Sequence, residues 1–589
     1  MASLSTQTNT DPTKRYNVYC EDVNESYCKI DFSEIEDIYL LTDTKVAFAE
    51  QLSAFASNYR HNPKYRAGLW DGKVRFYKIV GQYMVFPKGL WKYLLRKTQT
   101  AQELQNVNFV YKSTTEYFKV TFEEFNDFIL SLNMPFPPYD YQVQAAYDSI
   151  TQGRLTIGAA TSSGKSCIIY LIYSWMIKHN LKTMLIVPNV MLTKQMYQDF
   201  QDYGMQNIDD YITLIGGDEC KTIDEKRILF GDAINGGTNI ISTWQSLYNS
   251  SELFDSIDCI IVDEVHSAKS TVFSEIILPA AVNSKYRLGL TGTMPPDYTD
   301  KLSILGSLGP HKTYIDAQGL IERGLATPVE IHMMFLNYSD ADKEQMKSIR
   351  NYADEVKFLE LNSNRTNYIT KVAAKVSTKG NTLVMFNTIA HGKSLLETYL
   401  KHRFNITNLL FLDSLTPKNL ATVPKDAKKV FVNTNLDDKQ KAKIIKAGLD
   451  PDIFESLEQY NIYIIFGNID DAERERIRQI MELVHDATLF ASYGTMSTGV
   501  SIRNIHFILL TASTKSPIRL QQTVGRGMRK HETKEKMIIL DFIDDFSRVN
   551  KQGNVIESSK NHTLKHSEER ISLYVSNRYP IIEREIFLS

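Results

Sequence analysis

The sequence is poor in cysteine and has no long apolar run. Its five cysteines are odd in number and form no Cys-x-x-Cys pair, which argues against a disulfide framework and a zinc site. No stretch approaches the roughly 18 consecutive apolar residues that a membrane-spanning helix needs. The polar N-terminal segment lacks the apolar core of a secretory signal. These absences predict a soluble protein of a reduced cytoplasm.

An excess of charge of one sign is also missing, because the formal net charge is only -2. Binding to a polyanion would therefore depend on local basic patches. One such patch covers residues 59–97, where ten basic residues face one acid, Asp71. Aromatic side chains such as Trp70 lie between them, and they either stack on exposed bases or form the core of a small domain. The predicted DNA contacts within this patch are Arg60, Lys64, Arg66, Lys73 and Arg75.

What the chain has in abundance is an alternation of short apolar runs with amphipathic helices. One series of runs lies at 155–158, 184–187, 239–242, 259–262 and 287–290, and a second lies at 383–386, 462–465, 489–492, 507–510 and 537–540. This alternation predicts parallel sheets covered by helices on both faces. A chain of 589 residues is too long to fold around a single hydrophobic core, so we expect several domains. We expect an α/β protein with two tandem parallel-sheet lobes at 106–327 and 328–545, a small N-terminal α+β domain at 1–105, and a short helical C-terminal tail at 546–589.

A candidate phosphate-binding loop follows the first of these runs. The segment Ala159-Ala-Thr-Ser-Ser-Gly-Lys-Ser166 fits the Walker A pattern, with alanine in place of the first glycine. Small residues here let backbone N–H groups surround a phosphate at the start of the next helix. Lys165 would reach the β- and γ-phosphates, and Ser166 would hold Mg²⁺. The predicted phosphate-binding residues are Thr161, Ser162, Ser163, Gly164, Lys165 and Ser166. The alternative is an ordinary loop with an accidental Gly-Lys pair.

An acidic pair ends the run at 259–262. Asp263 and Glu264 would lie at the carboxyl edge of a parallel sheet, where such sheets bind ligands. Asp263 suits the Mg²⁺ shell, and Glu264 suits polarising the attacking water. His266 is either a surface histidine or a residue that couples this site to a second one.

The second lobe contains Gln522-Thr-Val-Gly-Arg526-Gly-Met-Arg529. Charge that develops on a γ-phosphoryl group needs fixed cations, and arginine side chains supply them. Arg526 and Arg529 are three residues apart, so we expect both to project from one helical face. The alternative is a basic helix on a solvated face. With Lys165 and the acidic pair, these residues complete the predicted catalytic set.

These elements, in this order and spacing, resemble motifs I, II and VI of superfamily 2 helicases. Further segments resemble the glutamine motif and motifs Ia, Ib, III, IV and V, at 139–142, 187–195, 242–246, 291–293, 384–387 and 497–500. The resemblance implies two RecA-like lobes that bind ATP between them and a strand-binding groove across both. It implies that Gln142 reads adenine, that Gln522 is catalytic, that Gly499 is close to the nucleotide, and that His266, Thr291 and Thr293 couple ATP to the groove. The groove residues that it implies are Pro188, Gln195, Thr243, Trp244, Gln245, Phe386, Asn387 and Thr498.

Three further segments, at 61–73, 491–499 and 562–566, are similar to the UvsW-type helicases of T-even-like bacteriophages. This resemblance covers nearly the whole chain. It implies an ATP-dependent DNA helicase that migrates junctions, reverses forks and dissociates R-loops and D-loops in phage recombination, replication and repair. It also implies work in the host bacterial cytoplasm, with a single-strand-binding or recombination protein as a potential partner.

One segment departs from the family pattern. Residues 414–459 form an insertion with eight lysines, which is either a solvated surface or a contact to one arm of branched DNA. Two other functions remain open: a double-stranded DNA translocase that does not separate strands, and a clamp that uses ATP only as a conformational ligand. The intact Glu264, Arg526 and Arg529 argue against the clamp.

Overall fold

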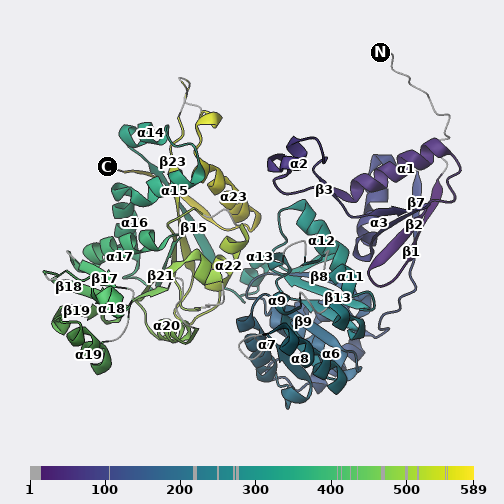
Figure 1. The fold of residues 1–589 in the computed structure, drawn as a ribbon, viewed down its shortest axis with the longest axis horizontal. Coiled ribbons are helices and arrows are strands. Elements are labelled where there is room, and N and C mark those ends of the chain that lie inside the picture. The colour runs from purple at the N-terminus through teal and green to yellow at the C-terminus, as the bar shows by residue number, and fades with distance from the viewer. Residues whose placement is uncertain are drawn as a thin grey trace. The chain divides into compact units, whose positions relative to one another are not determined.

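The computed structural model forms two compact units, residues 1–316 and 317–589 (Figure 1). It describes residues 15–104, 106–216, 222–247, 251–268, 272–273, 277–407, 409–412, 414–424, 426–433, 436–465, 471–497, 502–513, 517–548, 550, 552 and 555–588. Each unit contains one seven-stranded parallel sheet, which confirms the predicted pair of RecA-like lobes. Among the described residues, no helix is long and apolar enough to cross a membrane.

The first unit begins with a small mixed sheet. Its strand order is β5-β6-β2-β1-β7, and β1 pairs antiparallel with β2 but parallel with β7. The bounds are β1 Tyr16–Asp22, β2 Tyr27–Asp31, β5 Lys78–Val80, β6 Tyr83–Pro87 and β7 Val107–Lys112, with α1 at Ile38–Gln51 and α3 at Trp91–Thr100. A separate pair, β3 (Ser53–Phe55) and β4 (Lys73–Arg75), frames a long hairpin that contains α2 (Pro63–Arg66). We call residues 53–75 the basic hairpin.

The large sheet of the first unit has the order β10-β11-β9-β12-β13-β8-β14. Its strands are β8 Arg154–Ala159, β9 Thr183–Val187, β10 Ile212–Ile215, β11 Asn239–Thr243, β12 Cys259–Val262, β13 Tyr286–Thr291 and β14 His311–Ile315. The principal helices are α4 Phe122–Ser131, α5 Asp140–Gln152, α6 Lys165–Lys178, α7 Val190–Asp202, α8 Ile223–Gly236 and α12 Tyr298–Leu308. Every residue of β8, β9, β11, β12 and β13 is buried, which explains why these strands appear in the sequence as continuous apolar runs.

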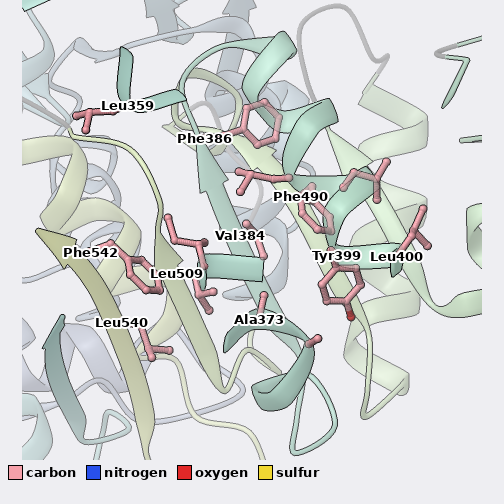
Figure 2. Packing of buried hydrophobic residues seen from close by; sticks show 14 of the residues in the cluster. Leu359, Ala373, Val384, Phe386, Tyr399, Leu400, Phe490, Leu509, Leu540 and Phe542 are labelled. Carbon is pink, nitrogen blue, oxygen red and sulfur yellow. The ribbon is translucent and has the colours of Figure 1, made fainter. Parts of the chain in front are cut away.

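The sheet of the second unit has the order β20-β21-β16-β22-β23-β15-β24. Its strands are β15 Val329–Asn337, β16 Thr382–Phe386, β20 Ile462–Ile465, β21 Thr488–Ser492, β22 Phe507–Leu510, β23 Met537–Asp545 and β24 Ile581–Phe587. The helices are α13 Ala317–Glu322, α14 Asp340–Met346, α15 Tyr352–Leu361, α16 Ser363–Val376, α17 Ile389–Phe404, α20 Asp471–Leu483, α21 Tyr493–Ser497, α22 Pro517–Gly527 and α23 His562–Ser576. Apolar side chains of the sheet pack against α16 and α17 in one cluster (Figure 2).

The C-terminal segment is not the short helical tail that the sequence predicts. After α23 the chain forms β24, which pairs in parallel with β15 and completes the edge of the sheet. The Arg570 guanidinium of α23 also donates to both carboxylate oxygens of Asp541 on β23, each at 2.9 Å. The segment is therefore an integral part of the second unit.

The insertion forms a small folded subdomain. Its three parallel strands, β17 (Leu409–Leu412), β18 (Lys429–Val432) and β19 (Phe454–Ser456), pack with α18 (Pro417–Leu420) and α19 (Asp438–Lys446) around their own apolar cluster. In Figure 1 it lies next to α17 at one end of its unit. The lysine-rich insertion therefore has a hydrophobic core of its own.

A buried ion network holds the small N-terminal sheet on the large sheet of the first unit. Lys88 is 1% exposed, and its ammonium group lies 3.0 Å from carboxylate oxygens of both Asp22 and Glu25. Glu25 in turn lies 3.7 Å from Arg154, the first residue of β8. Arg287 of β13 donates to the Ser26 hydroxyl at 2.7 Å. These contacts join residues at the start of the chain to the strands that carry the phosphate loop.

Replacing Lys88 by methionine is expected to lower the free energy of unfolding by about 3–5 kcal/mol at pH 7, because it leaves buried carboxylates uncompensated. Burial alone would raise the pKa of Asp22, but hydrogen bonds from Tyr111 and Lys88 outweigh it and hold the pKa at about 2. The ionised Asp22 therefore stabilises the fold above about pH 4, and this contribution is lost as the pH falls toward 2. The difference in the free energy of unfolding between the wild type and the Lys88→Met variant should therefore narrow as the pH falls from about 4 toward 2.

Urea unfolding at pH 7, 4 and 2.5 measures this effect. The matched control is Lys29→Met, which removes a half-exposed ion pair with Glu21 (3.4 Å) on the same sheet. It should cost less than about 1 kcal/mol. Equal unfolding midpoints for the Lys88 variant and this control at pH 7 would contradict the prediction.

Candidate nucleotide and nucleic-acid sites

The loop between β8 and α6 has the backbone shape of a phosphate site. Ser162 and Gly164 both adopt left-handed conformations, with φ of 70° and 74°. A Cβ at position 164 would lie 2.5 Å from Nε2 of Gln142, so only glycine fits there. The Ser163 hydroxyl is buried and has no hydrogen-bond partner among the described residues. A loop of this shape at a helix N-terminus fits a bound phosphate group.

Gln142 and Tyr141, at the start of α5, support this loop from one side. The Gln142 amide donates to the Ser163 carbonyl at 2.9 Å and accepts from the Tyr139 N–H at 2.8 Å. The Tyr141 hydroxyl donates to the same Ser163 carbonyl at 2.7 Å. Gln142 therefore positions the phosphate loop. That it also reads adenine, as the resemblance implies, stays a prediction. Tyr141, which lies in the segment 139–142 but was not among the predicted site residues, is a second positioning residue.

The predicted catalytic residues of the first unit lie close together. Glu264 is in a left-handed conformation (φ 47°), and its carboxylate lies 3.1 Å from the Lys165 ammonium and 3.3 Å from the His266 ring. Asp263 is buried, and this burial, followed by the charge of Glu264, raises its pKa to about 7, although Lys165 opposes the shift. A buried acidic pair of this kind is stabilised by a divalent cation. Ser166 and Asp263 carry the oxygen ligands that Mg²⁺ prefers.

The Ser166 hydroxyl lies 2.6 Å from the Tyr203 hydroxyl, just beyond the end of α7. Tyr203 is half-buried, and this burial raises its pKa, so its hydroxyl stays protonated and can share a hydrogen bond with Ser166. Sequence reasoning missed Tyr203, because a single tyrosine at a helix end carries no motif.

The three predicted coupling residues form a hydrogen-bonded series. The His266 ring nitrogen lies 2.7 Å from the Thr291 hydroxyl, which donates to the Thr293 carbonyl at 2.7 Å. Burial lowers the pKa of His266, so the ring is neutral. A Cβ at Gly292 would lie 3.3 Å from the Thr161 backbone nitrogen, so this segment passes close to the phosphate loop. The coupling role itself stays a prediction.

Two of the predicted groove residues in the first unit belong to the core. Trp244 is 6% exposed and packs edge-on against Phe273, with ring centroids 5.7 Å apart. Thr243 is buried, and its hydroxyl lies 3.1 Å from the Ser246 hydroxyl. The prediction of direct strand contact through these two side chains is wrong. The other three candidates remain available at the surface: Pro188 is half-buried, and Gln195 and Gln245 are exposed.

In the second unit, Phe386 is also a core residue. It is fully buried at the end of β16, and Figure 2 shows its ring within the main apolar cluster. A Cβ at Gly392 would lie 2.7 Å from this ring, which shows how tightly it packs. The predicted DNA contact through Phe386 is therefore wrong. Asn387 is exposed and donates to the Ser513 carbonyl at 3.1 Å.

Arg526 lies in the last turn of α22, and Gln522 lies on the same helix. The helix ends at Gly527, so Arg529 follows it in a bend. The expectation that both arginines project from one helical face is wrong for Arg529. Its carbonyl accepts from the Thr327 hydroxyl at 3.3 Å, which fixes the backbone there. Thr498 and Gly499 lie outside the described residues.

The basic hairpin brings the five predicted N-terminal DNA contacts onto one element. Phe55 and Tyr59 stack with ring centroids 4.6 Å apart, and Tyr65 meets Tyr59 edge-on at 4.9 Å. Trp70 is half-buried and donates to the Lys73 carbonyl at 3.0 Å. Phe76 and Tyr77 pack against the core of the N-terminal sheet, so some of the aromatics of the patch belong to the core, as the alternative proposed. The exposed basic side chains are Arg60, Lys64, Arg66 and Arg75, while Lys73 is half-buried.

The hairpin packs against the start of α12. The Thr299 hydroxyl donates to the Phe55 carbonyl at 2.8 Å, and the Ser57 hydroxyl donates to the Asp297 carboxylate. Because α12 follows the Thr291–Thr293 segment, the hairpin is connected to the coupling residues through a short stretch of chain. Lys88 and Lys92 also belong to the basic patch in sequence, but Lys88 is buried in the ion network.

The chain is similar in sequence to one protein family and to two viral proteins. The family model "Type III restriction enzyme, res subunit" matches residues 135–296. The ATP-dependent DNA helicase uvsW of Enterobacteria phage T4 is 26% identical over 548 residues, which cover 90% of this chain and 94% of the relative. Putative helicase 22 of Sulfolobus islandicus filamentous virus is 24% identical over 423 residues, 69% of this chain and 64% of the relative.

Among solved structures, the crystal structure of T4 UvsW has 23% identity and a TM-score of 0.43, and covers 97% of this chain and 100% of that chain. The DNA-bound type ISP restriction-modification enzyme LlaBIII has 12% identity and a TM-score of 0.51, and covers 84% of this chain and 34% of that chain. The chain is thus similar over 90% of its length to an ATP-dependent DNA helicase, and its residues 135–296 match the family of restriction-enzyme res subunits.

Proposed function

We propose that the chain uses ATP to move on DNA and to remodel branched DNA, by migrating junctions, regressing forks and dissociating R-loops and D-loops. The strongest support is a series of contacts within the first unit. It begins at the Lys165–Glu264 ion pair and passes through His266 to Thr291. The short stretch of chain after Thr293 then leads into α12, against which the basic hairpin packs. A site suited to phosphate groups and an element suited to DNA are thus connected by side-chain contacts and by one short segment of chain.

In this proposal ATP is the substrate, bound by the loop 161–166. Ser166 and Asp263 would hold Mg²⁺, which would supply positive charge to the phosphates. Lys165 binds the phosphate oxygens, and Glu264 orients the attacking water. Gln142 keeps the loop in shape. Hydrogen bonds hold Gln142 and Ser166, and an ion pair joins Lys165 to Glu264, in support of these roles.

The second unit completes the proposed machinery. Arg526 and Arg529 stabilise the charge that develops on the γ-phosphoryl group, assisted by Gln522, with Gly499 close to the nucleotide. Asn387 and Thr498 contribute to the strand groove, together with Pro188, Gln195 and Gln245 of the first unit. The proposed setting is the cytoplasm of an infected bacterium, where a single-strand-binding or recombination protein is the proposed partner.

The test is ATP hydrolysis and strand displacement on matched linear, forked and four-way DNA. We expect the wild type to remodel forked and four-way DNA, and DNA to stimulate phosphate release. Replacing Arg60, Lys64 and Arg66 by glutamine should weaken binding to branched DNA roughly tenfold or more at physiological salt, because three phosphate contacts are lost. Hydrolysis without DNA should not change.

A matched control removes three exposed lysines elsewhere, in the variant Lys371→Gln, Lys375→Gln and Lys379→Gln. Its net charge equals that of the hairpin variant, so any difference between them reflects position. Equal loss of binding in both variants would contradict a specific role for the hairpin. Failure of the wild type to act on any branched DNA would contradict the function itself.

A double-stranded DNA translocase is the second candidate, favoured by the match to the restriction-enzyme family model over 135–296. Such a motor would displace a third strand from a triplex while leaving forks intact. A triplex-displacement assay beside the fork assay separates the two functions.

A further inference from the structure

The second unit contains a pocket that no sequence motif indicated. It has a volume of about 330 Å³ and lies between α15, α16 and the first turns of α17. Side chains with hydrogen-bonding groups form most of its lining: Lys357, Glu360, Thr366, Asn367, His391 and Ser394. It adjoins the carboxyl end of β16, where Asn387 is exposed, and parallel sheets bind their ligands at this edge.

Two buried groups in this pocket have unmet hydrogen-bonding capacity. His391 is 2% exposed, and neither ring nitrogen has a hydrogen-bond partner within the described part of the chain. One carboxylate oxygen of Glu360 is likewise unpaired. The closest approach between the two, 3.6 Å from Nδ1 to Oε1, is too long for a hydrogen bond. Buried polar atoms without partners destabilise a fold, and a bound group that hydrogen-bonds to them would remove this cost.

Thr388 holds both groups in place. Its hydroxyl donates to the other oxygen of Glu360 at 2.7 Å and accepts from the His391 backbone N–H at 3.2 Å. The free oxygen of Glu360 is therefore oriented as an acceptor. Burial, with a smaller contribution from Arg365, lowers the pKa of His391 to about 3. The ring is thus neutral, and one of its nitrogens carries a hydrogen that it can donate.

We propose that this pocket receives the Watson–Crick edge of one unpaired base of a bound DNA strand. Each of the four bases presents a donor and an acceptor next to each other on that edge, for example N3–H and O4 of thymine. The Glu360 oxygen and the His391 N–H form the complementary pair. A base that is still paired has no free edge to offer, so the pocket distinguishes unpaired from paired bases and does not select a sequence. This inference rests on the proposed action on DNA.

Other residues at the pocket suit the remaining parts of a nucleotide. Leu361 is 74% exposed, which provides an apolar contact for the face of the base. Lys357 is exposed and can approach an adjacent phosphate. Recognition of splayed bases on their Watson–Crick edges is an established mode for single strands. The ring of Phe386 is buried and cannot contact a base, whereas this pocket, close to the end of β16, is open to one.

The test compares two single strands of equal length and charge, one with thymine bases and one with N3-methylthymine bases. Methylation blocks the N3–H donor, but leaves the backbone and the stacking face intact. The full-length protein should bind the thymine strand roughly tenfold more tightly, which corresponds to about 1.4 kcal/mol. Replacing Glu360 by methionine, or His391 by leucine, should reduce this preference to less than about threefold, on the same scale. The dependence of binding on salt should not change, because no phosphate contact is lost.

Thermal unfolding separates this role from a structural one. His391→Leu removes two unpaired buried nitrogens, so its melting temperature should equal or exceed that of the wild type. Glu397→Met, on α17 but outside the pocket lining, is the matched control and should keep the full preference. Equal wild-type affinity for the two strands would overturn the inference, as would a preference that persists in both pocket variants. Absence of binding to either strand at low salt would instead contradict the proposed function.

Discussion

Replacing Lys165 by alanine is expected to reduce the rate of ATP hydrolysis by about 10²–10³-fold, because a fixed cation at the phosphates is lost. The Lys165 ammonium lies 3.1 Å from Glu264 and is largely buried. The other residues of the loop 159–166 are uncharged, so none of them replaces its charge. The variant also removes the charge that opposes the raised pKa of Asp263, which weakens the proposed Mg²⁺ site. Phosphate release at saturating ATP, with and without DNA, measures the loss.

The matched control is Lys178→Ala, at the other end of the same helix, which should hydrolyse ATP at the wild-type rate. DNA binding without nucleotide should persist in the Lys165 variant, since the basic hairpin is unchanged. Hydrolysis by the Lys165 variant within about threefold of wild type would remove the assignment of the phosphate loop.

Arg526→Ala is expected to lower the rate of hydrolysis by about 10³-fold or more, as the loss of an arginine finger does. Arg526→Lys should rescue little of it, because lysine cannot reproduce the planar, bidentate contacts of a guanidinium group. Binding of ATP and of DNA should change much less than the rate. Single-turnover hydrolysis, combined with nucleotide binding at equilibrium, separates these quantities.

Arg526 belongs to the second unit and Lys165 to the first. A comparable loss in both variants would therefore mean that hydrolysis needs groups from both units. Lys530→Ala, an exposed neighbour, is the control and should leave the rate unchanged. Wild-type rates in Arg526→Ala would overturn the proposal of a shared site. Arg529→Ala tests separately whether the residue beyond the helix end also contributes.

The sequence predicts that the residues of the proposed phosphate site lie close together, and the structure agrees, because the pattern is local. Gly164, Lys165 and Ser166 are consecutive, and Asp263 and Glu264 directly follow an apolar run, so strand and loop positions determine their placement. The parallel lobes were equally predictable, because strands buried on both faces are apolar throughout.

Side-chain direction at the ends of strands and helices could not be predicted in the same way. Phe386 and Trp244 occur in segments that resemble strand-binding motifs. In the fold, however, Phe386 packs over Gly392 and Trp244 packs against Phe273, so both aromatic side chains are buried. These partners are distant from the motifs or carry no signal of their own. An aromatic residue in such a segment therefore fits the core as well as it fits DNA.

Features that depend on distant pairs were also missed. Lys88 was part of a basic patch in the sequence, but Asp22 and Glu25 bury it. The pocket at Glu360 and His391 joins two different helices, and neither residue lies in a motif of its own. β24 has three charged residues among seven, so its sequence lacks the apolar character of a strand, and only its place at the sheet edge explains it.

The ion network around Lys88 has a mechanical consequence. It fastens the N-terminal sheet to Arg154 and Arg287, on the two neighbouring strands β8 and β13, and β8 leads directly into the phosphate loop. The basic hairpin is continuous in sequence with this N-terminal sheet and also packs against α12 of the same unit. In the proposed motor, DNA bound by the hairpin would therefore move together with the strands that carry the ATP site.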